Sequence, residues 1–505
     1  MRPLVGGSRW VWLSPVLLSL ACSGAPHPGA GGAPETGGAD AGGAGPGGAG
    51  GMGTGAAGAG GVAAIGGAAG LGGAAGSAGC SFDIQDELST VIPTVGIVHW
   101  STDLAGLTSA NVEFTLNDPA PDEINRGGGG PIDVSGQMHR ALLLGMKAGR
   151  SYTYRIVAHG GGNATCTSAD RSLTTGPFVD PNVTNGDSLV ITVVRNSAPA
   201  PGFIVTSDYV HALAYVIDTD GDFVWWAASP YSCGRARMDW EGANMWMLEA
   251  NGTNTGGDVR RISMDGTDVE DNVAGLAAAH HDLAVLPGGI VATLLWTTQT
   301  NQASDLVERA PDGTIETVAR IDGSVFPGKT VTGTYHANSL AYHVADDTYT
   351  VGDLYGTGYA KLTRGGQVVW QFLASCAAGT KCATGDTEGN HGHHLLDSGT
   401  LLFFKARVDP SLVDEYSLTE TSTSLSASLI WSYTPDNNLE TTIMGDVQRL
   451  PNGDTLIVWA DPGEMREVSP AGDVIQRIVA SDKSGPSDGF GYADFRQSLY
   501  GPPLR

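Results

Sequence analysis

Short runs in which apolar and polar side chains alternate, or small apolar clusters stand between turn residues, follow one another from Cys80 onwards. Within residues 80–176 the clearest runs are 95–100, 110–114, 139–144 and 152–158. A period of two places alternate side chains on one face of a strand, and the residues between the runs favour turns. The pattern predicts a small β-sandwich over this part of the chain.

The same segment resembles a fibronectin type III domain. The resemblance rests on the strand that carries Trp100, on the turn 144–149 before Tyr152 and Tyr154, and on the closing residues 173–175. Such modules serve as spacers or docking units, so we expect no catalysis within residues 80–176.

A second pattern begins after a linker near residues 177–181. A turn followed by a strand with a tryptophan or β-branched residues recurs at 220–226, 265–269, 312–315, 365–370, 429–431 and 471–475. Neighbouring units lie roughly 45 to 65 residues apart, which is the scale of propeller blades. One such sheet cannot bury both of its faces alone, so the sheets are expected to pack radially around a channel. The predicted fold class is therefore all-β: an N-terminal β-sandwich followed by a six-bladed β-propeller over residues 185–505.

Three histidines share one spacing within these repeats. His281 and His336 are 336 − 281 = 55 residues apart, and His336 and His391 are 391 − 336 = 55 residues apart. Equivalent positions in successive blades converge on the propeller axis, so the three side chains are expected to meet there. The corresponding place in the next blade is Gly445, with Asp446 beside it. The interrupted ring predicts an asymmetric pocket.

Charge and composition limit the classes of partner that the protein is expected to bind. The 505 residues include 74 glycines, and acidic residues exceed basic ones by 53 − 27 = 26. An excess of negative charge argues against nucleic acid or an anionic membrane surface as a partner. The sequence does not predict an oligomeric state.

The N-terminus is typical of an export signal. Arg2 and Arg9 precede the apolar run 10–21, which Cys22 follows. Residues 18–22 resemble a lipoprotein signal, which predicts lipidation of Cys22; an ordinary signal peptide cleaved nearby is the alternative. Residues 1–22 are thus interpreted as the signal, and the Gly/Ala-rich residues 23–79 as a disordered linker. The protein is expected outside the cytoplasm, as an outer-membrane or cell-surface lipoprotein held only by its lipid anchor, or else periplasmic or secreted.

Five cysteines remain after Cys22. Cys80 and Cys166 open and nearly close the first folded region, so we expect them to pair, and Cys376 and Cys382 enclose a short loop and are expected to pair as well. Cys233 is left over, and we expect it to be buried.

Residues 185–501 together resemble the bacterial aryl-sulfate sulfotransferases. The resemblance rests on the histidines, the blade markers and the closing segments 445–453 and 490–496, in this order. It implies an extracytoplasmic six-bladed propeller with an N-terminal β-sandwich. It also implies transfer of a sulfuryl group from a phenyl sulfate to a phenol through a histidine-bound intermediate, without a nucleotide donor or another cofactor.

The resemblance assigns roles residue by residue. His391, in Asn390-His391-Gly392, stands at the position of the nucleophile, although the family usually has an acidic residue at 392. His281 matches an earlier histidine, and His336 and Asn338 match a His-x-Asn motif. If protonated, His281 and His336 would stabilise sulfuryl oxygens or exchange the phenol proton, while Asn338 offers an amide donor.

One family residue is missing. The family carries an arginine that holds the sulfuryl oxygens, and residues 351–356 contain none. Lys405 and Arg407 are the candidate substitutes, or else they lie at an outward-facing strand end. Trp296, with Trp240 and Trp246, is a candidate platform for the aromatic substrate, with packing between blades as the alternative.

Two other interpretations stay open. His391, His393 and His394 have the side chains of metal ligands, but adjacent residues on a strand face opposite sides, so we expect no catalytic metal. The alternative class is a surface-tethered propeller that binds a ligand without catalysis. The missing arginine favours that second class, whereas the three histidines and Asn338 favour the enzyme.

Overall fold

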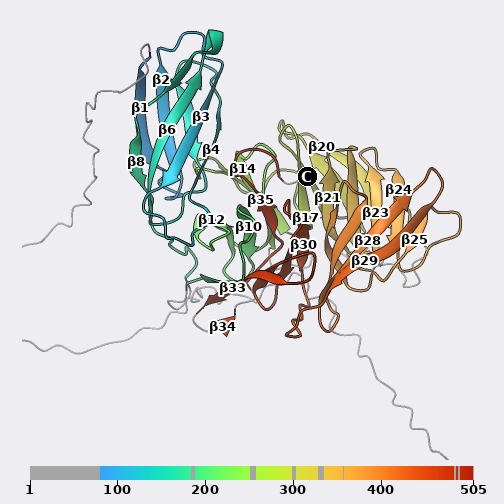
Figure 1. Ribbon diagram of the computed structural model, residues 1–505. Helices are drawn as coiled ribbons and strands as arrows, with labels where there is room; N and C mark the ends of the chain where they lie inside the picture. Colours follow the sequence, from blue (N-terminus) through green and yellow to red (C-terminus); the bar gives the residue numbers. More distant parts are fainter. Residues whose placement is uncertain are drawn as a thin grey trace, which may run out of the picture. The chain divides into compact units, whose positions relative to one another are not determined.

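The computed structural model describes residues 80–183, 188–250, 257–297, 303–327, 335–355, 358–482, 485–486 and 489–503. The regular secondary structure of these residues consists of β-strands and one short 3-10 helix, η1 (Gly161–Asn163) (Figure 1). Among them, no helix has the length and apolar character needed to cross a membrane. The signal, Cys22 and the linker 23–79 lie outside the described residues.

The N-terminal region is a β-sandwich of two antiparallel sheets. One sheet has the order β1, β2, β5, with bounds Phe82–Leu88, Gly96–Thr102 and His139–Leu143. The other has the order β4, β3, β6, β7, with β8 also paired to β6; the bounds are Gly127–Ile132, Ser109–Leu116, Ser151–His159, Thr165–Thr167 and Arg171–Thr174. The four strands expected from the alternating pattern are β2, β3, β5 and β6.

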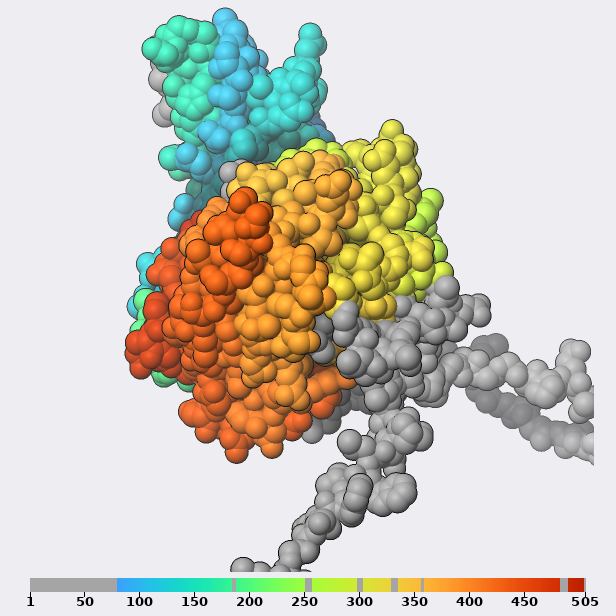
Figure 2. Space-filling model, turned by 90° about the vertical axis from the view of Figure 1, so that its right-hand side faces the viewer, coloured from blue at the N-terminus to red at the C-terminus, as the bar shows by residue number. Residues whose placement is uncertain are grey.

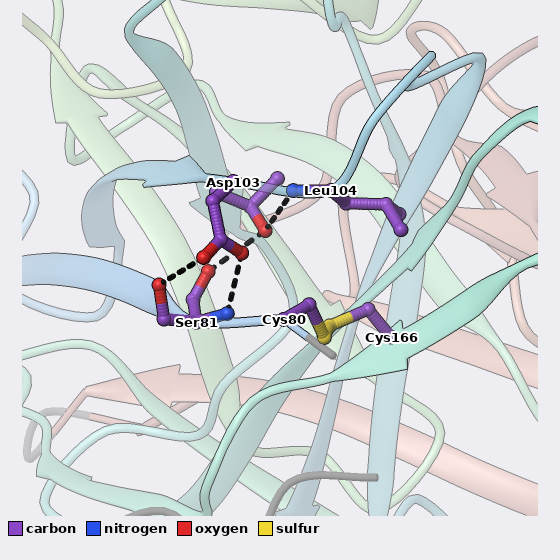
Figure 3. Close-up of a disulfide and its surroundings, with 6 residues drawn as sticks. Cys80, Ser81, Asp103, Leu104 and Cys166 are labelled. Carbon is purple, nitrogen blue, oxygen red and sulfur yellow. Dashed lines mark hydrogen bonds between the residues drawn. A yellow bond between two sulfur atoms is a disulfide. The ribbon is translucent and has the colours of Figure 1, made fainter. Parts of the chain in front are cut away.

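Alternation decides which side chains form the core of the sandwich. In β6, Tyr152, Tyr154 and Ile156 are buried, whereas Arg155 between them is exposed. Trp100 from β2 lies in the same core and is fully buried. A disulfide joins Cys80, next to β1, to Cys166 of β7, as expected (Figure 3). Beside this disulfide, Ser81 donates from its backbone N and from Oγ to the carboxylate of Asp103 (Figure 3).

The remaining strands form six blades, each with its strands in antiparallel order from the channel outwards. The first three are β35 (Asp494–Arg496), β10 (Phe203–Asp208), β11 (Leu213–Asp218) and β12 (Phe223–Ala228); β13 (Ser232–Met238), β14 (Asn244–Ala250), β15 (Gly257–Ser263) and β16 (Val269–Glu270); and β17 (Ala279–Leu286), β18 (Ile290–Trp296), β19 (Ser304–Arg309) and β20 (Ile315–Ile321). A single bridge between Gly257 and Ala279 links the second and third blades.

The other three blades follow in chain order. They are β21 (Ala337–His343), β22 (Thr348–Asp353), β23 (Gly358–Thr363) and β24 (Val368–Leu373); β26 (Asn390–Leu395), β27 (Thr400–Lys405), β28 (Leu412–Glu420) and β29 (Leu425–Tyr433); and β30 (Asp446–Arg449), β31 (Thr455–Trp459), β32 (Glu464–Val468) and β33 (Val474–Asp482). Strand β25 (Cys382–Thr384) adds to β24 in parallel, and β34 (Gly485–Pro486) adds to β33.

Strands from both ends of the propeller close the ring. Near the C-terminus, β35 pairs with β10 and supplies the innermost strand of the first blade. At the start, β9 (Val190–Arg195) pairs with β33, the outer strand of the last blade. Backbone hydrogen bonds therefore hold the first and last blades together and leave fewer unpaired strand edges.

Each hydrophobic cluster of the propeller draws on neighbouring blades, because a sheet must bury both of its faces. Tyr215 and Trp226 of the first blade pack with Leu456 and Met465 of the last. In Figure 2 the yellow, orange and red-orange parts of the chain lie side by side on the surface in chain order. The fold class expected from the sequence, a β-sandwich followed by a six-bladed propeller, is confirmed.

The six recurring turns turn out to share one structural position. Five markers lead into the fourth strand of a blade, at β12, β16, β20, β24 and β33, and the marker 429–431 lies within the corresponding strand, β29. Gly366, in the turn before β24, has φ of 80°, and a Cβ there would lie 2.1 Å from the carbonyl oxygen of Val318. Only glycine fits such a turn without displacing the neighbouring strand.

The cysteine expectations for the described residues are also confirmed. Cys376 pairs with Cys382 across the short loop that leads into β25. Cys233 is free and buried, and burial raises the pKa of its thiol well above the ordinary range. An inert, buried thiol results.

Candidate functional site: the histidines at the channel

The inner strands β17, β21 and β26 share a local irregularity. Their register shifts between His280 and Leu283, between Ala337 and Ser339, and between Asn390 and His393. Such bulges add residues to one strand of a pair and re-aim the side chains there. His281, Asn338 and His391 lie within these bulges, and His336 immediately precedes β21. His281, Asn338 and His391 therefore occupy equivalent positions in three successive blades, whereas His336 lies two residues before that position.

The first group of aromatic side chains surrounds His281. The rings of His281 and His336 are 4.5 Å apart between centroids, and the ring of Tyr355 is 5.4 Å from that of His336. The indole of Trp296 stacks on His280, with centroids 3.6 Å apart and an angle of 11° between the planes. One face of Trp296 is therefore occupied by His280. This packing is closer to the alternative interpretation of Trp296 than to a substrate platform.

The second group centres on His391, which is 4% exposed. Its Nδ1 lies 3.3 Å from Oη of Tyr492, and Tyr492 donates its hydroxyl hydrogen to the carbonyl oxygen of Asn338 at 2.7 Å. Because that hydrogen is already used, Tyr492 Oη accepts from Nδ1–H of His391. A neutral imidazole with its hydrogen on Nδ1 carries a lone pair on Nε2. Nε2 of His391 is buried and has no hydrogen-bond partner among the described residues.

Burial keeps these imidazoles neutral. It lowers the pKa of His391 to about 3, and the nearby His281 and Arg407 add to the effect. Burial and the charge of Arg407 lower the pKa of His281 to about 4. Burial therefore favours the neutral form of His281 near pH 7 over the protonated form that would stabilise sulfuryl oxygens. A neutral His281 instead contributes one N–H donor and one lone pair.

Asn338 has one amide hydrogen engaged and its oxygen unmatched. Its Nδ2 donates to the carbonyl oxygen of Asn390 at 2.8 Å, and its Oδ1 is buried without a partner among the described residues. Buried polar atoms are nearly always satisfied, so an orphaned atom beside His391 calls for an explanation. A bound ligand or water would satisfy Oδ1 by donating a hydrogen.

The two candidate cations differ in their surroundings. Lys405 is buried, and its Nζ lies 2.5 Å from Asp386 and 3.5 Å from Asp414, so its charge is neutralised by carboxylates. Arg407 follows β27, is exposed, and donates from Nε to the carbonyl oxygen of Thr442. The charge of Arg407 affects both His281 and His391. Of the two candidates, Arg407 is the one whose field reaches the histidines.

A third cation lies deeper in the channel. Arg235 of β13 is fully buried, with Nε 3.0 Å from Asp282 and Nη1 2.9 Å from Asp446. Its guanidinium carbon also lies 5.3 Å from the ring centroid of Tyr492. Burial raises the pKa of Asp446 to about 7, although Arg235 opposes that shift. Arg235 thus forms ion pairs with both carboxylates and a cation–π contact with the ring of Tyr492.

Asp446 also explains why residue 392 is a glycine. A Cβ at Gly392 would lie 2.1 Å from Oδ1 of Asp446 and 2.7 Å from its Cα. The carboxylate of the neighbouring blade fills the space that a side chain at 392 would need. An acidic residue at position 392 is therefore sterically excluded here.

The other histidines of the run lie elsewhere. His393 bonds to Ser339 and Thr350 through its two ring nitrogens, and Nδ1 of His394 accepts from the backbone N of Arg449. Both line a cavity of about 110 Å³ together with His343, Arg237 and Trp240, whereas His281, His336 and His391 do not line it. Trp246 is buried in the packing between blades. The run therefore divides between His391, which lies with the channel histidines, and the adjacent His393 and His394, which share one cavity contrary to the expected alternation.

Among the described residues, the side chains close enough together to hold a metal ion are three aspartates and no histidines. Asp218, Asp220 and Asp222 bring ligand atoms within 4.8 Å of one another. Nζ of Lys147 lies 3.3, 2.7 and 2.9 Å from these carboxylates. The ammonium group already compensates the negative charge there.

Sequence reasoning assigned no role to His280 or Tyr492. Both stood in segments that it singled out, His280 beside His281 and Tyr492 within 490–496. Tyr492 reaches His391 only because β35 returns to the first blade and closes the ring. No local signal in the sequence reveals that contact.

Fold and site together define a sandwich–propeller protein with neutral, buried histidines at its channel. No family model matches the chain, and no curated protein matches it. Among solved structures, a streptogramin B lyase is similar at 12% identity with a TM-score of 0.37, over 61% of this chain and 98% of that one. Apo AztD from Citrobacter koseri has 11% identity and a TM-score of 0.30, over 59% of this chain and 99% of that one. The PQQ-bound aldose sugar dehydrogenase from Streptomyces coelicolor has 10% identity and a TM-score of 0.33, over 57% of this chain and 84% of that one. These likenesses concern the fold alone.

Proposed function

We propose that the chain transfers a sulfuryl group from an aryl sulfate ester to a phenol through a sulfohistidine at His391. One observation carries the proposal: a buried, neutral imidazole has its hydrogen held on Nδ1 by Tyr492, while Nε2 is unpartnered. A neutral imidazole of this kind is a competent nucleophile. The sequence resemblance of residues 185–501 to aryl-sulfate sulfotransferases supports the same chemistry.

In the first step, Nε2 of His391 attacks the sulfur of the ester. The N–S bond forms, the S–O bond to the aryl group breaks, and the aryloxide leaves with its electron pair. Nδ1 keeps its hydrogen, which remains bonded to Tyr492. The positive charge that develops on the imidazole is offset by the sulfonate that it now carries.

In the second step, a phenol attacks the sulfur of the sulfohistidine. The N–S bond breaks, and its electron pair returns to Nε2 of His391. The phenol proton passes to an imidazole, for which His281 and His336 stand with their ring centroids 4.5 Å apart. The two displacements share one enzyme intermediate, so the kinetics are expected to be ping-pong.

The sulfuryl oxygens carry negative charge throughout both steps. Arg407 is the proposed source of compensation, because its charge reaches both His281 and His391. Asn338 contributes an amide beside His391. The proposal requires no cofactor and no metal, and its partners are small aromatic sulfate esters and phenols.

An extracytoplasmic location fits this chemistry and is part of the proposal. The N-terminal sequence is typical of an export signal with lipidation at Cys22. Two disulfides, Cys80–Cys166 and Cys376–Cys382, are of a kind that persists in oxidising compartments. A lipid anchor would be the means of contact with a membrane.

The test is incubation of purified residues 80–505 with 4-nitrophenyl sulfate, with and without excess phenol. We expect nitrophenolate release that depends on phenol, and a sulfuryl adduct on the intact protein that maps to His391. Peptide mapping at alkaline pH, which avoids acid cleavage of the sulfur–nitrogen bond, identifies the modified residue. Binding of the ester without release or adduct in a folded sample would favour the other class, a propeller that binds its ligand without catalysis.

A further inference from the structure

His280 and His281 are adjacent in the chain, yet their rings lie on the same side of β17. Their Nδ1 atoms are 2.8 Å apart, and their ring centroids are 5.0 Å apart. Successive side chains of a regular strand point to opposite faces, so this contact requires an irregular backbone. The bulge between His280 and Leu283 provides it.

The backbone of His281 is in the left-handed region, with φ of 61°. A side chain with a Cβ rarely adopts this conformation, and such strain persists only where the surrounding structure enforces it. His281 is 8% exposed and His280 is 3% exposed, so the strained pair is held in the interior. The strained backbone of His281 occurs together with the contact between the two imidazoles.

Two further contacts fix the ring of His280. Its face stacks on Trp296, and its Nε2 lies 2.9 Å from Oγ of Ser304, which is fully buried. Both nitrogens of His280 are therefore engaged, one by Ser304 and one by His281. Burial and the two neighbouring histidines also lower the pKa of His280 well below its ordinary value.

We infer that His280, backed by Ser304 and Trp296, is a positioning residue that makes His281 the proton acceptor for the incoming phenol. This inference rests on the proposed sulfuryl transfer. Each neutral imidazole carries one N–H, so a single hydrogen occupies the Nδ1–Nδ1 contact. The inferred arrangement places that hydrogen on Nδ1 of His281, which donates to Nδ1 of His280, while Nε2–H of His280 donates to Oγ of Ser304.

In this arrangement the lone pair of His281 is on Nε2. When the phenol attacks sulfur, its O–H bond breaks and the proton forms a bond to Nε2 of His281. The resulting imidazolium keeps its Nδ1–H bonded to neutral His280, and this bond strengthens because its donor is now charged. The proton leaves Nε2 to solvent before the next turnover, so the protons balance and no other reactant is needed.

The first test reads the tautomer directly and needs no turnover. Nitrogen-15 NMR of histidine-labelled protein, with His280→Phe and His281→Gln used for assignment, should show His281 protonated at Nδ1 and unprotonated at Nε2 at pH 7. In His280→Phe, which preserves a flat ring against Trp296, His281 should lose this fixed tautomer. A hydrogen on Nε2 of His281 in the wild-type protein would overturn the inference, whether or not the protein transfers sulfuryl groups.

The second test uses the acidity of the acceptor. With a weakly acidic phenol, His280→Phe should lower kcat on the order of a hundredfold with little change in KM for the sulfate donor. With a phenol that is already ionised at the assay pH, no proton is transferred, and the loss should shrink to a few-fold. His280→Gln, which can still bond to His281 through its amide, should recover part of the rate.

The matched control is His343→Phe, a half-buried histidine of an inner strand that does not adjoin His281. It should retain the wild-type dependence on acceptor acidity. If His280→Phe lowers kcat equally for both classes of phenol, His280 acts only through packing and the inference fails. If the wild type shows no transfer but the expected tautomer, the proposed function fails while the pairing of His280 and His281 stands.

Discussion

Two polar clusters in the interior of this protein differ in whether opposite charges pair within them. Lys147, from the segment between β5 and β6, is 1% exposed, and its Nζ lies within 3.3 Å of Glu123, Asp218, Asp220 and Asp222. Arg150 and Arg195 bind Glu123 and Asp220 from the outer side. The charges of this cluster are compensated by neighbours of opposite sign.

The histidine cluster at the channel is built differently. Nε2 of His391 and Oδ1 of Asn338 are buried without partners among the described residues, and His281 has a strained backbone. Burial lowers the pKa of both His281 and His391, which favours their neutral forms near pH 7. The comparison indicates that the Lys147 cluster stabilises the fold, whereas the histidine cluster keeps unused bonding capacity for a ligand.

The largest expected effect on activity comes from His391→Ala. If the comparison holds, transfer from 4-nitrophenyl sulfate falls on the order of a thousandfold or more, because the nucleophile is lost. The thermal midpoint should stay nearly unchanged, since the side chain contributes little packing. His343→Ala is the matched control and should transfer at the wild-type rate. Global unfolding of His391→Ala would show that His391 is structural.

Lys147→Met should show the opposite behaviour. Removing the ammonium leaves buried carboxylates without their cation, and the free energy of unfolding should fall by about 3–5 kcal/mol. Urea unfolding followed by tryptophan fluorescence measures this loss. Lys381→Met removes a more exposed ion pair with Glu420 and should cost less than about 1 kcal/mol. Equal losses in the two variants would remove the distinction between a buried and a surface pair.

Arg407→Gln should have an intermediate effect on activity. Arg407 is exposed, so its charge is partly screened, and kcat/KM should fall about tenfold, less than for a buried oxyanion donor. The wild-type kcat/KM should also decrease with added salt, while that of the variant should depend less on salt. An identical salt dependence in both proteins would exclude Arg407 as the compensating charge.

The smallest effect is expected from pH. With a pKa of about 3, His391 is already neutral at pH 5, so the rate of nitrophenyl sulfate cleavage should be nearly constant between pH 5 and 7.5. A histidine with an ordinary pKa of 6.5 would lose roughly thirtyfold at pH 5. A rate that falls steadily below pH 6.5 would place His391 in water rather than in a buried site.

The same pKa shift has a defined sign for stability. Unfolded His391 binds a proton near pH 6.5, whereas folded His391 does so near pH 3, so acidification between these values favours the unfolded state. The stability that His391 contributes is complete above pH 6.5 and is lost as the pH falls. His391→Gln should therefore lose less stability than the wild type between pH 7 and pH 5, which thermal unfolding at both pH values measures.

Much of the architecture follows from local patterns in the sequence. The period-two alternation in residues 152–158 predicts β6, and the six turn-and-strand markers predict one outer strand for each blade. Short-range chemistry determines both features, because turn residues and alternation act over a few residues. The two disulfides and buried Cys233 are likewise expected from spacing. The common position of His281 and His391 in successive inner strands follows from the repeat.

Other features depend on contacts between distant residues. Lys405 looks like a free cation in the sequence, but Asp386 and Asp414 neutralise it in the structure. Trp296 looks like a platform for substrate, but His280 covers one of its faces. These outcomes depend on which side chains meet across strands and loops, and a single residue type does not specify that.

The sequence by itself therefore determined the class of fold, the number of blades and the histidines that face one region of the channel. Only the tertiary structure decided the partners of those histidines. Tyr492 meets His391 from 101 residues away, and Asp446 fills the space beside Gly392. The physical reason is that ring closure by β35 and the register shifts of the inner strands set these contacts. Both arise from pairing between blades, which the local pattern of hydrophobic and polar residues does not encode.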